Sequence, residues 1–563
     1  MSNTGKMKYE PLGFDQWLAL DAGEAARRTR LAPAGDPAWI VAPEGIPRTG
    51  GPGPLAGLSF AVKDNIDVAG MPTTAACPAF SYQPDRDAEV VVRLVAAGAV
   101  PVGKTNLDQF ATGLVGTRSP YGPVPNVHNP AYVGGGSSSG SASVVARGLV
   151  PFSLGTDTAG SGRVPAGLQG VVGFKPTRGW FSTRGVVPAC RSLDCVSIFA
   201  ARVRDAARVA SVVGGYDPED PYSRRPEPAA GFQVPTRRLA VPSRLGWFGD
   251  PVQEQAWEEA LGRWRALGYT LVPVDPRPLA QMAALLYEGP WVAERVAGVA
   301  GFYPAQAARM DPVVRTIFDG AARFDASSAF RAEYRRRDLA RIIGGLWSGC
   351  DALLVPTVPR VYTLAEVSAQ PLETNAILGT WTNFVNLADL CALSVPAGYR
   401  TDGLPFGVTL VGRAWEDERL VVLGQEWEPW CDEVRVAVVG AHLSGLPLNH
   451  LLVRRGGRLV RAVRTAPVYR LFALEEQTPV KPGLVRVADG GASVDAELWS
   501  LPRAAYGAFV AEIPPPLGIG TVELEDGSRV QGFLCEAWTT SGRRDITSWG
   551  GWRAWLASGE TAR

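Results

Sequence analysis

The stretch from Gly134 to Arg163, GGGSSSGSASVVARGLVPFSLGTDTAGSGR, constrains the fold more than any other part of the chain. It contains two glycine-rich turns, the first with Ser137 and the second with Ser161, separated by a helix-like run and an apolar strand-like run. Glycine lets the backbone approach a ligand closely and direct successive N–H groups at it. The remaining sequence must show which ligand these amides face.

The segments around these turns predict an α/β domain. Residues 58–63 are rich in β-branched and aromatic side chains, which indicates a strand, and Asp64-Asn65 then signals a turn. Further patterns predict helices at 88–97 and 141–146 and strands at 99–102 and 150–154. Such alternation favours helices packed on a central sheet.

The pattern changes near residues 428–434. Before this point, helical periodicity occurs at residues 14–31, 205–213, 252–267, 329–346 and 417–427. From Val434 on, short strand-like runs alternate with turns, and long helical patterns are absent. We therefore predict one domain at residues 1–430, with 1–50 as an N-terminal helical extension, and a smaller α+β domain at residues 431–563.

Composition excludes several classes of function. The chain has 563 residues and a formal net charge of +1, which gives no electrostatic reason to expect nucleic acid or a membrane surface as partner. It lacks both an apolar run of about 20 residues and a signal-peptide pattern. The seven cysteines are scattered without CxxC spacing, which favours reduced thiols in the cytoplasm. With only three histidines, no metal site is expected.

Lys63 ends an apolar strand just before a tight turn, an arrangement that would hold its stem in the interior. Desolvation lowers the pKa of a lysine because the charged form loses hydration, and a neutral amine can act as a base. The alternative is an ion pair with Asp64 or another carboxylate.

The serines also have alternatives. Ser137, Ser138 and Ser139 suit a helix N-cap, and a phosphate loop is unsupported because no GxxxxGK[ST] lysine is present. On the second turn, backbone N–H groups near Ser161 would form an oxyanion hole, worth on the order of 3 kcal/mol per donor in acyl transfer. A serine nucleophile still needs a base, and no histidine lies in a comparable motif of this domain.

AVKDN, GGGSSSGS and GTDTAGSGR, in this order, resemble the amidase signature family of serine hydrolases over about residues 50–425. The resemblance implies a central mixed sheet covered by helices and a Ser–Ser–Lys triad that works without a metal or organic cofactor. Ser161 is then the acyl-forming nucleophile, Ser137 a proton relay on a cis peptide bond, and Lys63 the base.

The same resemblance implies roles for the neighbours of Ser161. The oxyanion hole is expected from the backbone amides of Thr158, Ala159, Gly160 and Ser161. Hydrogen bonds that brace the site are expected from Ser138, Asp157 and Arg163.

LLYEGPWVAER and RSLDCVSIF resemble the allophanate hydrolase branch of this family, in which a Tyr and an Arg matching Tyr287 and Arg295 bind a small anionic substrate. An Arg fork pairs bidentately with a carboxylate, and allophanate carries one. Pro290 is expected to restart a helix that carries Arg295. The alternative is an Arg295 on an exposed helix face beside Glu294.

VVGAHLSGLPLNH and DITSWGGWRAWLAS resemble the C-terminal domain of allophanate hydrolases, which is related in fold to γ-glutamyl cyclotransferases. The resemblance implies that this domain assists decarboxylation of N-carboxycarbamate with a histidine. His442 is the first candidate and His450 the second; alternatively, either is a core or surface histidine. We interpret His128 as structural or incidental.

The hypothesis from the sequence is a cytoplasmic amidohydrolase that converts allophanate to ammonia and carbon dioxide in urea degradation. The resemblance further implies a homodimer and functional coupling to a urea carboxylase. One rival is an amidase of broader specificity or an amidotransferase A-type subunit. The other is a non-catalytic binding protein that kept the amidase fold.

Overall fold

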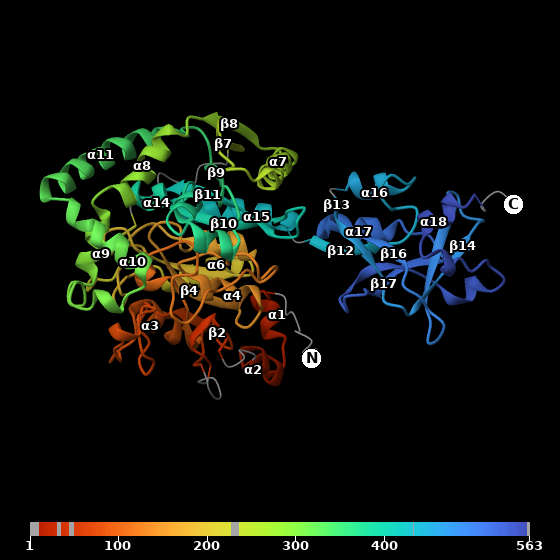
Figure 1. The fold of residues 1–563 in the computed structure, drawn as a ribbon, viewed down its shortest axis with the longest axis horizontal. Helices are drawn as coiled ribbons and strands as arrows, with labels where there is room; N and C mark the ends of the chain where they lie inside the picture. Colours follow the sequence, from red (N-terminus) through yellow and green to blue (C-terminus); the bar gives the residue numbers. More distant parts are fainter. Residues whose placement is uncertain are drawn as a thin grey trace. The chain divides into compact units, whose positions relative to one another are not determined.

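The computed structural model describes residues 11–30, 35–43, 50–226, 236–431, 433–455 and 457–559. It divides into two compact units, one of Met1–Arg400 with Leu404–Glu428 and one of Thr401–Gly403 with Pro429–Arg563 (Figure 1). Among the described residues, no helix is both long and apolar enough to cross a bilayer.

The first unit is built on a mixed sheet of eleven strands in the order β1-β3-β2-β4-β6-β5-β10-β11-β9-β7-β8. The strands are β1 (Trp39–Val41), β2 (Ser59–Lys63), β3 (Val100–Thr105), β4 (Phe152–Asp157), β5 (Val172–Lys175), β6 (Cys195–Ala200), β7 (Arg238–Pro242), β8 (Thr270–Val274), β9 (Ala352–Pro356), β10 (Leu390–Tyr399) and β11 (Pro405–Arg413). β2 runs parallel to β3 and β4, whereas β6 runs antiparallel to β4. The predicted mixed α/β sheet is confirmed.

Helices cover this sheet. They are α1 (Phe14–Leu18), α2 (Ala22–Arg30), α3 (Glu89–Ala96), α4 (Ser139–Ala146), α5 (Val164–Gln169), α6 (Val203–Val213), α7 (Pro251–Ala266), α8 (Arg277–Glu288), α9 (Trp291–Gly298), α10 (Pro312–Asp319), α11 (Ala326–Gly345), α12 (Leu364–Ala369), α13 (Glu373–Leu378), α14 (Asn383–Leu387) and α15 (Asp417–Cys431). α8, α9, α10 and α11 lie together at one end of the unit (Figure 1). α4, the helix after the first serine turn, is buried at every position. Its sequence SGSASVVA has only small and apolar side chains, so it can pack on all sides.

One predicted helix is divided in the structure. The pattern over residues 14–31 predicted a continuous helix, but α1 ends at Leu18 and α2 begins at Ala22, and Leu31 lies outside the described residues. The Asp21 carboxylate accepts a hydrogen bond of 2.8 Å from the Glu24 N–H. An Asp in this position satisfies a free amide at a helix start, so it favours a new helix over continuation of the first.

The second unit contains a five-stranded sheet, ordered β13-β16-β12-β18-β17, and a two-stranded sheet of β14 and β15. The strands are β12 (Glu433–Val438), β13 (Arg458–Arg464), β14 (Tyr469–Leu474), β15 (Lys481–Arg486), β16 (Asp495–Pro502), β17 (Leu517–Glu523) and β18 (Arg529–Cys535). The helices are α16 (Asn449–Val453), α17 (Arg503–Ala511) and α18 (Trp552–Ala557). Because the longest of these has 9 residues, the predicted α+β domain without long helices is confirmed.

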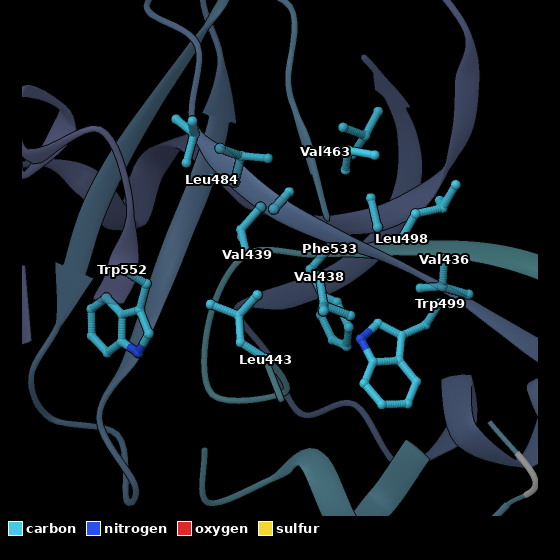
Figure 2. Close-up of a cluster of buried hydrophobic side chains, with 14 of the residues drawn as sticks. Val436, Val438, Val439, Leu443, Val463, Leu484, Leu498, Trp499, Phe533 and Trp552 are labelled. Atoms are coloured by element: carbon cyan, nitrogen blue, oxygen red, sulfur yellow. The ribbon is translucent and has the colours of Figure 1, made fainter. Parts of the chain in front are cut away.

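Buried side chains on β12 contribute to the core of this unit. Val434, Val436 and Val438 are buried on one face, and on the other face Arg435 is exposed whereas Ala437 is buried. Figure 2 shows Val436 and Val438 packed among buried aromatic and aliphatic residues that include Phe533. The unit therefore has a hydrophobic core of its own, and that core is next to the loop carrying His442.

Candidate active site

Lys63, the last residue of β2, is fully buried, and its Nζ donates hydrogen bonds to Ser137 Oγ at 2.8 Å and Thr156 Oγ1 at 2.7 Å. Burial lowers the pKa of Lys63 to about 7, because the ammonium loses its hydration and both hydroxyl partners are neutral. Three buried carboxylates oppose this shift: Asp108, Asp157 and Asp194. Near pH 7 a substantial share of this amine is therefore neutral and able to accept a proton.

The ion pair between Lys63 and Asp64 that the sequence left open is not formed. Asp64 instead lies 3.1 Å from Lys104 Nζ, and both of these side chains are fully buried. A second lysine thus neutralises the carboxylate next to Lys63. Lys63 is left with only hydroxyl oxygens as direct partners in the described part of the chain.

The first serine turn is held in place by Asp108. The peptide bond between Gly136 and Ser137 is cis, and the Asp108 N–H donates to the Ser137 carbonyl at 3.1 Å. The Asp108 carboxylate also accepts from the N–H groups of Gly116 and Arg118, each at 3.0 Å. A Cβ on Gly136 would lie 2.1 Å from Asp108 Oδ2, so only glycine fits at this position.

Ser138 occupies the N-cap position of α4, but its side chain makes no capping hydrogen bond. Its Oγ donates to the Thr156 carbonyl at 3.0 Å and accepts from the Thr156 N–H at 3.3 Å. The N-cap interpretation is therefore wrong for the Ser138 side chain. It joins the first serine turn to β4, which leads into the second.

The second serine turn is closed by a buried ion pair. Asp157, the last residue of β4, accepts from Gly160 N–H at 2.9 Å and Gly162 N–H at 3.0 Å, and Arg163 binds the same carboxylate through Nε and Nη2, each at 2.9 Å. Burial would raise the pKa of Asp157, but Arg163 outweighs it and holds the pKa below its usual range. The turn bearing Ser161 is thus fixed around one ionised carboxylate.

These contacts change the predicted oxyanion hole at one position. Gly160 cannot offer its N–H freely, since it donates to Asp157. Within the described residues, the amides of Thr158, Ala159 and Ser161 form no hydrogen bond. Three of the four expected donors are therefore available to a ligand.

Arg295 lies on α9, is 1% exposed and faces the Tyr287 ring, with 5.4 Å between Cζ and the ring centroid. Its Nη1 donates to Thr112 Oγ1 at 3.1 Å, whereas Nε and Nη2 are buried without a partner in the described structure. The alternative of an exposed Arg295 is therefore wrong. A buried guanidinium with two unsatisfied donors is costly unless a ligand pairs with them, and a carboxylate has the matching geometry.

Sequence reasoning missed Thr112, Thr156 and Asp194 as site residues. Thr156 and Asp194 lie inside GTDTAGSGR and RSLDCVSIF, so their motifs were found without their roles. Thr112 had no sequence signal, because its contact with Arg295 joins segments 183 residues apart.

In the second unit, the His442 ring stacks on Phe533, with centroids 4.8 Å apart, and meets Phe509 edge-on. Burial lowers the pKa of His442 to about 4, and the positive charge of Lys481 adds to the shift. His442 is therefore neutral near pH 7, and its ring makes no hydrogen bond within the described residues. His450, the second candidate, is exposed, with Nδ1 2.8 Å from the Pro447 carbonyl oxygen.

The described ranges contain no group of three or more His, Cys, Asp or Glu side chains that could hold a metal ion. Six cysteines, whose side chains are described, are buried free thiols: Cys77, Cys190, Cys195, Cys350, Cys391 and Cys535.

Comparison with known proteins relates both units to described families. Residues 44–421 match the amidase family, and residues 434–557 match the allophanate hydrolase C-terminal domain. The chain is 45% identical over 544 residues to the urea amidolyase of Saccharomyces cerevisiae, covering 89% of this chain and 30% of that protein. The urea amidolyase of Lachancea kluyveri gives 44% identity and the same coverage, so the chain spans 30% of the length of these relatives.

Among solved structures, the selenomethionine-substituted allophanate hydrolase of Kluyveromyces lactis is 42% identical, with a TM-score of 0.68. That match covers 97% of this chain and 99% of the other. The resemblance to the amidase family and its allophanate hydrolase branch, inferred from the motifs, is confirmed.

The buried pair of Asp157 and Arg163 predicts a large loss of stability when only one partner is removed. Arg163→Met should lower the free energy of unfolding by roughly 3–5 kcal/mol, since it leaves the Asp157 charge buried without its partner. The loss should shrink as the pH falls, because burial without Arg163 raises the pKa of Asp157 in the variant and the carboxyl group is then protonated and uncharged. Urea unfolding followed by tryptophan fluorescence measures both effects.

Arg204→Met is the matched control, because Arg204 pairs with Asp15 at 2.7 Å with both side chains more than half exposed. It should change the unfolding midpoint little. Equal effects of the two substitutions would contradict the structural role of the buried pair.

Proposed function

The chain belongs to the amidase family and ends in an allophanate hydrolase C-terminal domain, and on this basis we propose that it hydrolyses allophanate to ammonia and carbon dioxide. The observation that carries the proposal is Arg295, a buried guanidinium with two unpaired donors in the unit that also contains the Lys63–Ser137 pair. Allophanate is a short amide with a carboxylate at one end. Its carboxylate suits these donors, and its amide suits a serine nucleophile.

In the proposed reaction, Ser161 attacks the terminal amide carbonyl of allophanate. Its proton passes through Ser137 to neutral Lys63, which already hydrogen-bonds Ser137 at 2.8 Å. The amides of Thr158, Ala159 and Ser161 stabilise the oxyanion. Ammonia leaves with a proton returned along the same path, and water then releases N-carboxycarbamate from the acyl-enzyme.

Substrate choice is assigned to Tyr287 and Arg295. Nε and Nη2 of Arg295 form a fork for the two carboxylate oxygens, and the Tyr287 ring restricts the guanidinium on one side. Neutral acyl amides, unlike allophanate, have no carboxylate to pair with a buried cation, and this distinguishes allophanate hydrolysis from a broad amidase activity. A substrate panel separates them, because preference for neutral acyl amides over allophanate would favour the rival.

We assign the second step to the second unit. Its His442 is neutral and lies against two aromatic rings, so it can offer a hydrogen bond without a charge of its own, while Lys481 contributes positive charge nearby. An N-carboxycarbamate carries two negative charges. In the proposal, this environment orients it for loss of carbon dioxide.

The proposal includes partners and compartment. A homodimer and functional coupling to a urea carboxylase follow from the family resemblance, and the longer relatives named urea amidolyases support the second. Six buried free thiols support a reducing compartment such as the cytoplasm. Sedimentation velocity tests the dimer, and co-purification from the source cells tests the coupling.

Ser161→Ala should abolish ammonia release from allophanate, lowering kcat by at least about 10³-fold, because the nucleophile acts as a unit with its base. Ammonia is measured in a coupled assay, and circular dichroism checks that the fold is retained. Unchanged turnover in a folded variant would refute the serine mechanism.

The pKa of Lys63 predicts a pH dependence. Only the neutral amine accepts the proton, so kcat/KM should fall about tenfold per pH unit below pH 7 and level off above it. Initial rates measured between pH 5.5 and 9 check this. A profile without an acidic limb in this range would exclude neutral Lys63 as the base.

His442→Ala should slow carbon dioxide release while the first ammonia is still produced at the wild-type rate, since its role is confined to the second step. Parallel assays of ammonia and carbon dioxide on the full chain provide the measurement. His450→Ala is the control and should behave as wild type, because that ring is exposed. Equal carbon dioxide release by the His442 variant would remove the role assigned to it.

A further inference from the structure

The motif RSLDCVSIF contains a buried carboxylate that the proposed mechanism does not use. Asp194 lies just before β6 and is 7% exposed. Its Oδ1 accepts hydrogen bonds from Thr158 Oγ1 and from the Cys190 N–H, the latter at 3.1 Å, and its Oδ2 accepts from the Ala189 N–H at 2.8 Å. Asp194 therefore closes a turn at residues 189–194 and binds that turn to Thr158, next to the available amides.

The same turn is attached to α9 on its other side. The Glu294 carboxylate accepts from the Ser192 N–H at 2.7 Å and from Ser192 Oγ at 2.8 Å. Cys190 Sγ lies 3.4 Å from the Trp291 carbonyl oxygen and donates to it. Glu294 immediately precedes Arg295, so these contacts fix the first turns of the helix that carries the guanidinium.

We propose that the turn of residues 189–194 is a clamp that sets the spacing between the Ser161 turn and Arg295, with Asp194 and Glu294 as its positioning residues. The inference rests on the proposed function, in which these two parts bind opposite ends of one substrate. Allophanate is short and planar, so the distance between its reacting carbonyl and its carboxylate is fixed. A displacement of about 1 Å between the two binding groups can cost on the order of 10²-fold in rate.

Asp194 also acts on the site through its charge. Burial raises the pKa of Asp194 to about 6, so the carboxylate is ionised over most of the range in which neutral Lys63 is available. The negative charges of Asp194, Asp108 and Asp157 each oppose the lowering of the Lys63 pKa. The charge of Asp194 also favours the charged form of Arg295. Ser137 and Thr156, the direct partners of Lys63, are neutral.

Two variants of the full chain, Asp194→Asn and Glu294→Gln, test the clamp with two readouts. The first readout is kcat/KM on allophanate, which needs both ends of the site. The second is the rate at which a fluorophosphonate labels Ser161, which needs only the nucleophile turn. Glu294→Gln should lower kcat/KM by about 10–100-fold with labelling within about twofold of wild type. Asp194→Asn should slow both, and should move the acidic limb of the pH profile to lower pH.

The chain offers a close control for each variant. The Glu366 carboxylate accepts from the N–H and Oγ of Thr363, each at 2.8 Å, which repeats the contacts of Glu294 at another place. The buried Asp205 carboxylate accepts from the Phe14 N–H at 3.0 Å. Glu366→Gln and Asp205→Asn should therefore leave both readouts within about twofold of wild type. Thermal melts confirm that all four variants are folded.

The outcomes separate the clamp from the proposed substrate. Slower labelling in Glu294→Gln, or unchanged kcat/KM in both variants, would overturn the clamp. If the wild type released no ammonia from allophanate, the proposed function would fail, and the labelling rates would decide the clamp alone. Slower labelling confined to Asp194→Asn would then support it, and any other pattern would overturn it.

Discussion

The site depends above all on the burial of Lys63. An ammonium taken out of water and given only hydroxyl partners loses much of its preference for the charged form, which is why its pKa falls to about 7. The surrounding fold makes this possible by pairing the adjacent carboxylate, Asp64, with Lys104. Had Asp64 paired with Lys63, the amine would stay charged and could not serve as the proposed base.

Two of the buried arginines, Arg163 and Arg295, show how one residue type acquires two roles. Arg163 binds Asp157 bidentately, so the two charges neutralise each other and the pair stabilises the turn that carries Ser161. Arg295 has one hydroxyl contact, to Thr112, and two unsatisfied donors. Removing a guanidinium from water is costly for both residues. Asp157 offsets this cost for Arg163, whereas for Arg295 it is left to a ligand. The difference lies in the partners that the fold brings to each.

In the first unit, the candidate nucleophile and the candidate anion site come from distant parts of the chain, and short polar contacts join them. Ser138 links the first serine turn to β4, Asp157 closes the second turn, and Asp194, just before β6, accepts a hydrogen bond from Thr158. In the second unit, His442 lies against aromatic rings and is neutral. The two units therefore present different chemistry: one suited to nucleophilic attack, the other to binding without titration near pH 7.

The sequence alone determined the features that depend on local patterns. Alternation of strand and helix periods predicted the α/β unit, the change of pattern near residue 430 predicted a second unit, and the motifs around Lys63, Ser137 and Ser161 predicted the candidate site. Only the tertiary structure decided which charges meet. The structure pairs Lys104 with Asp64 and brings Thr112 to Arg295, and both contacts join segments that are distant in the chain. It also shows that the Gly160 N–H donates to Asp157, which the motif alone did not indicate. Periodicity reports which face of an element is buried, but not which polar group lies opposite it.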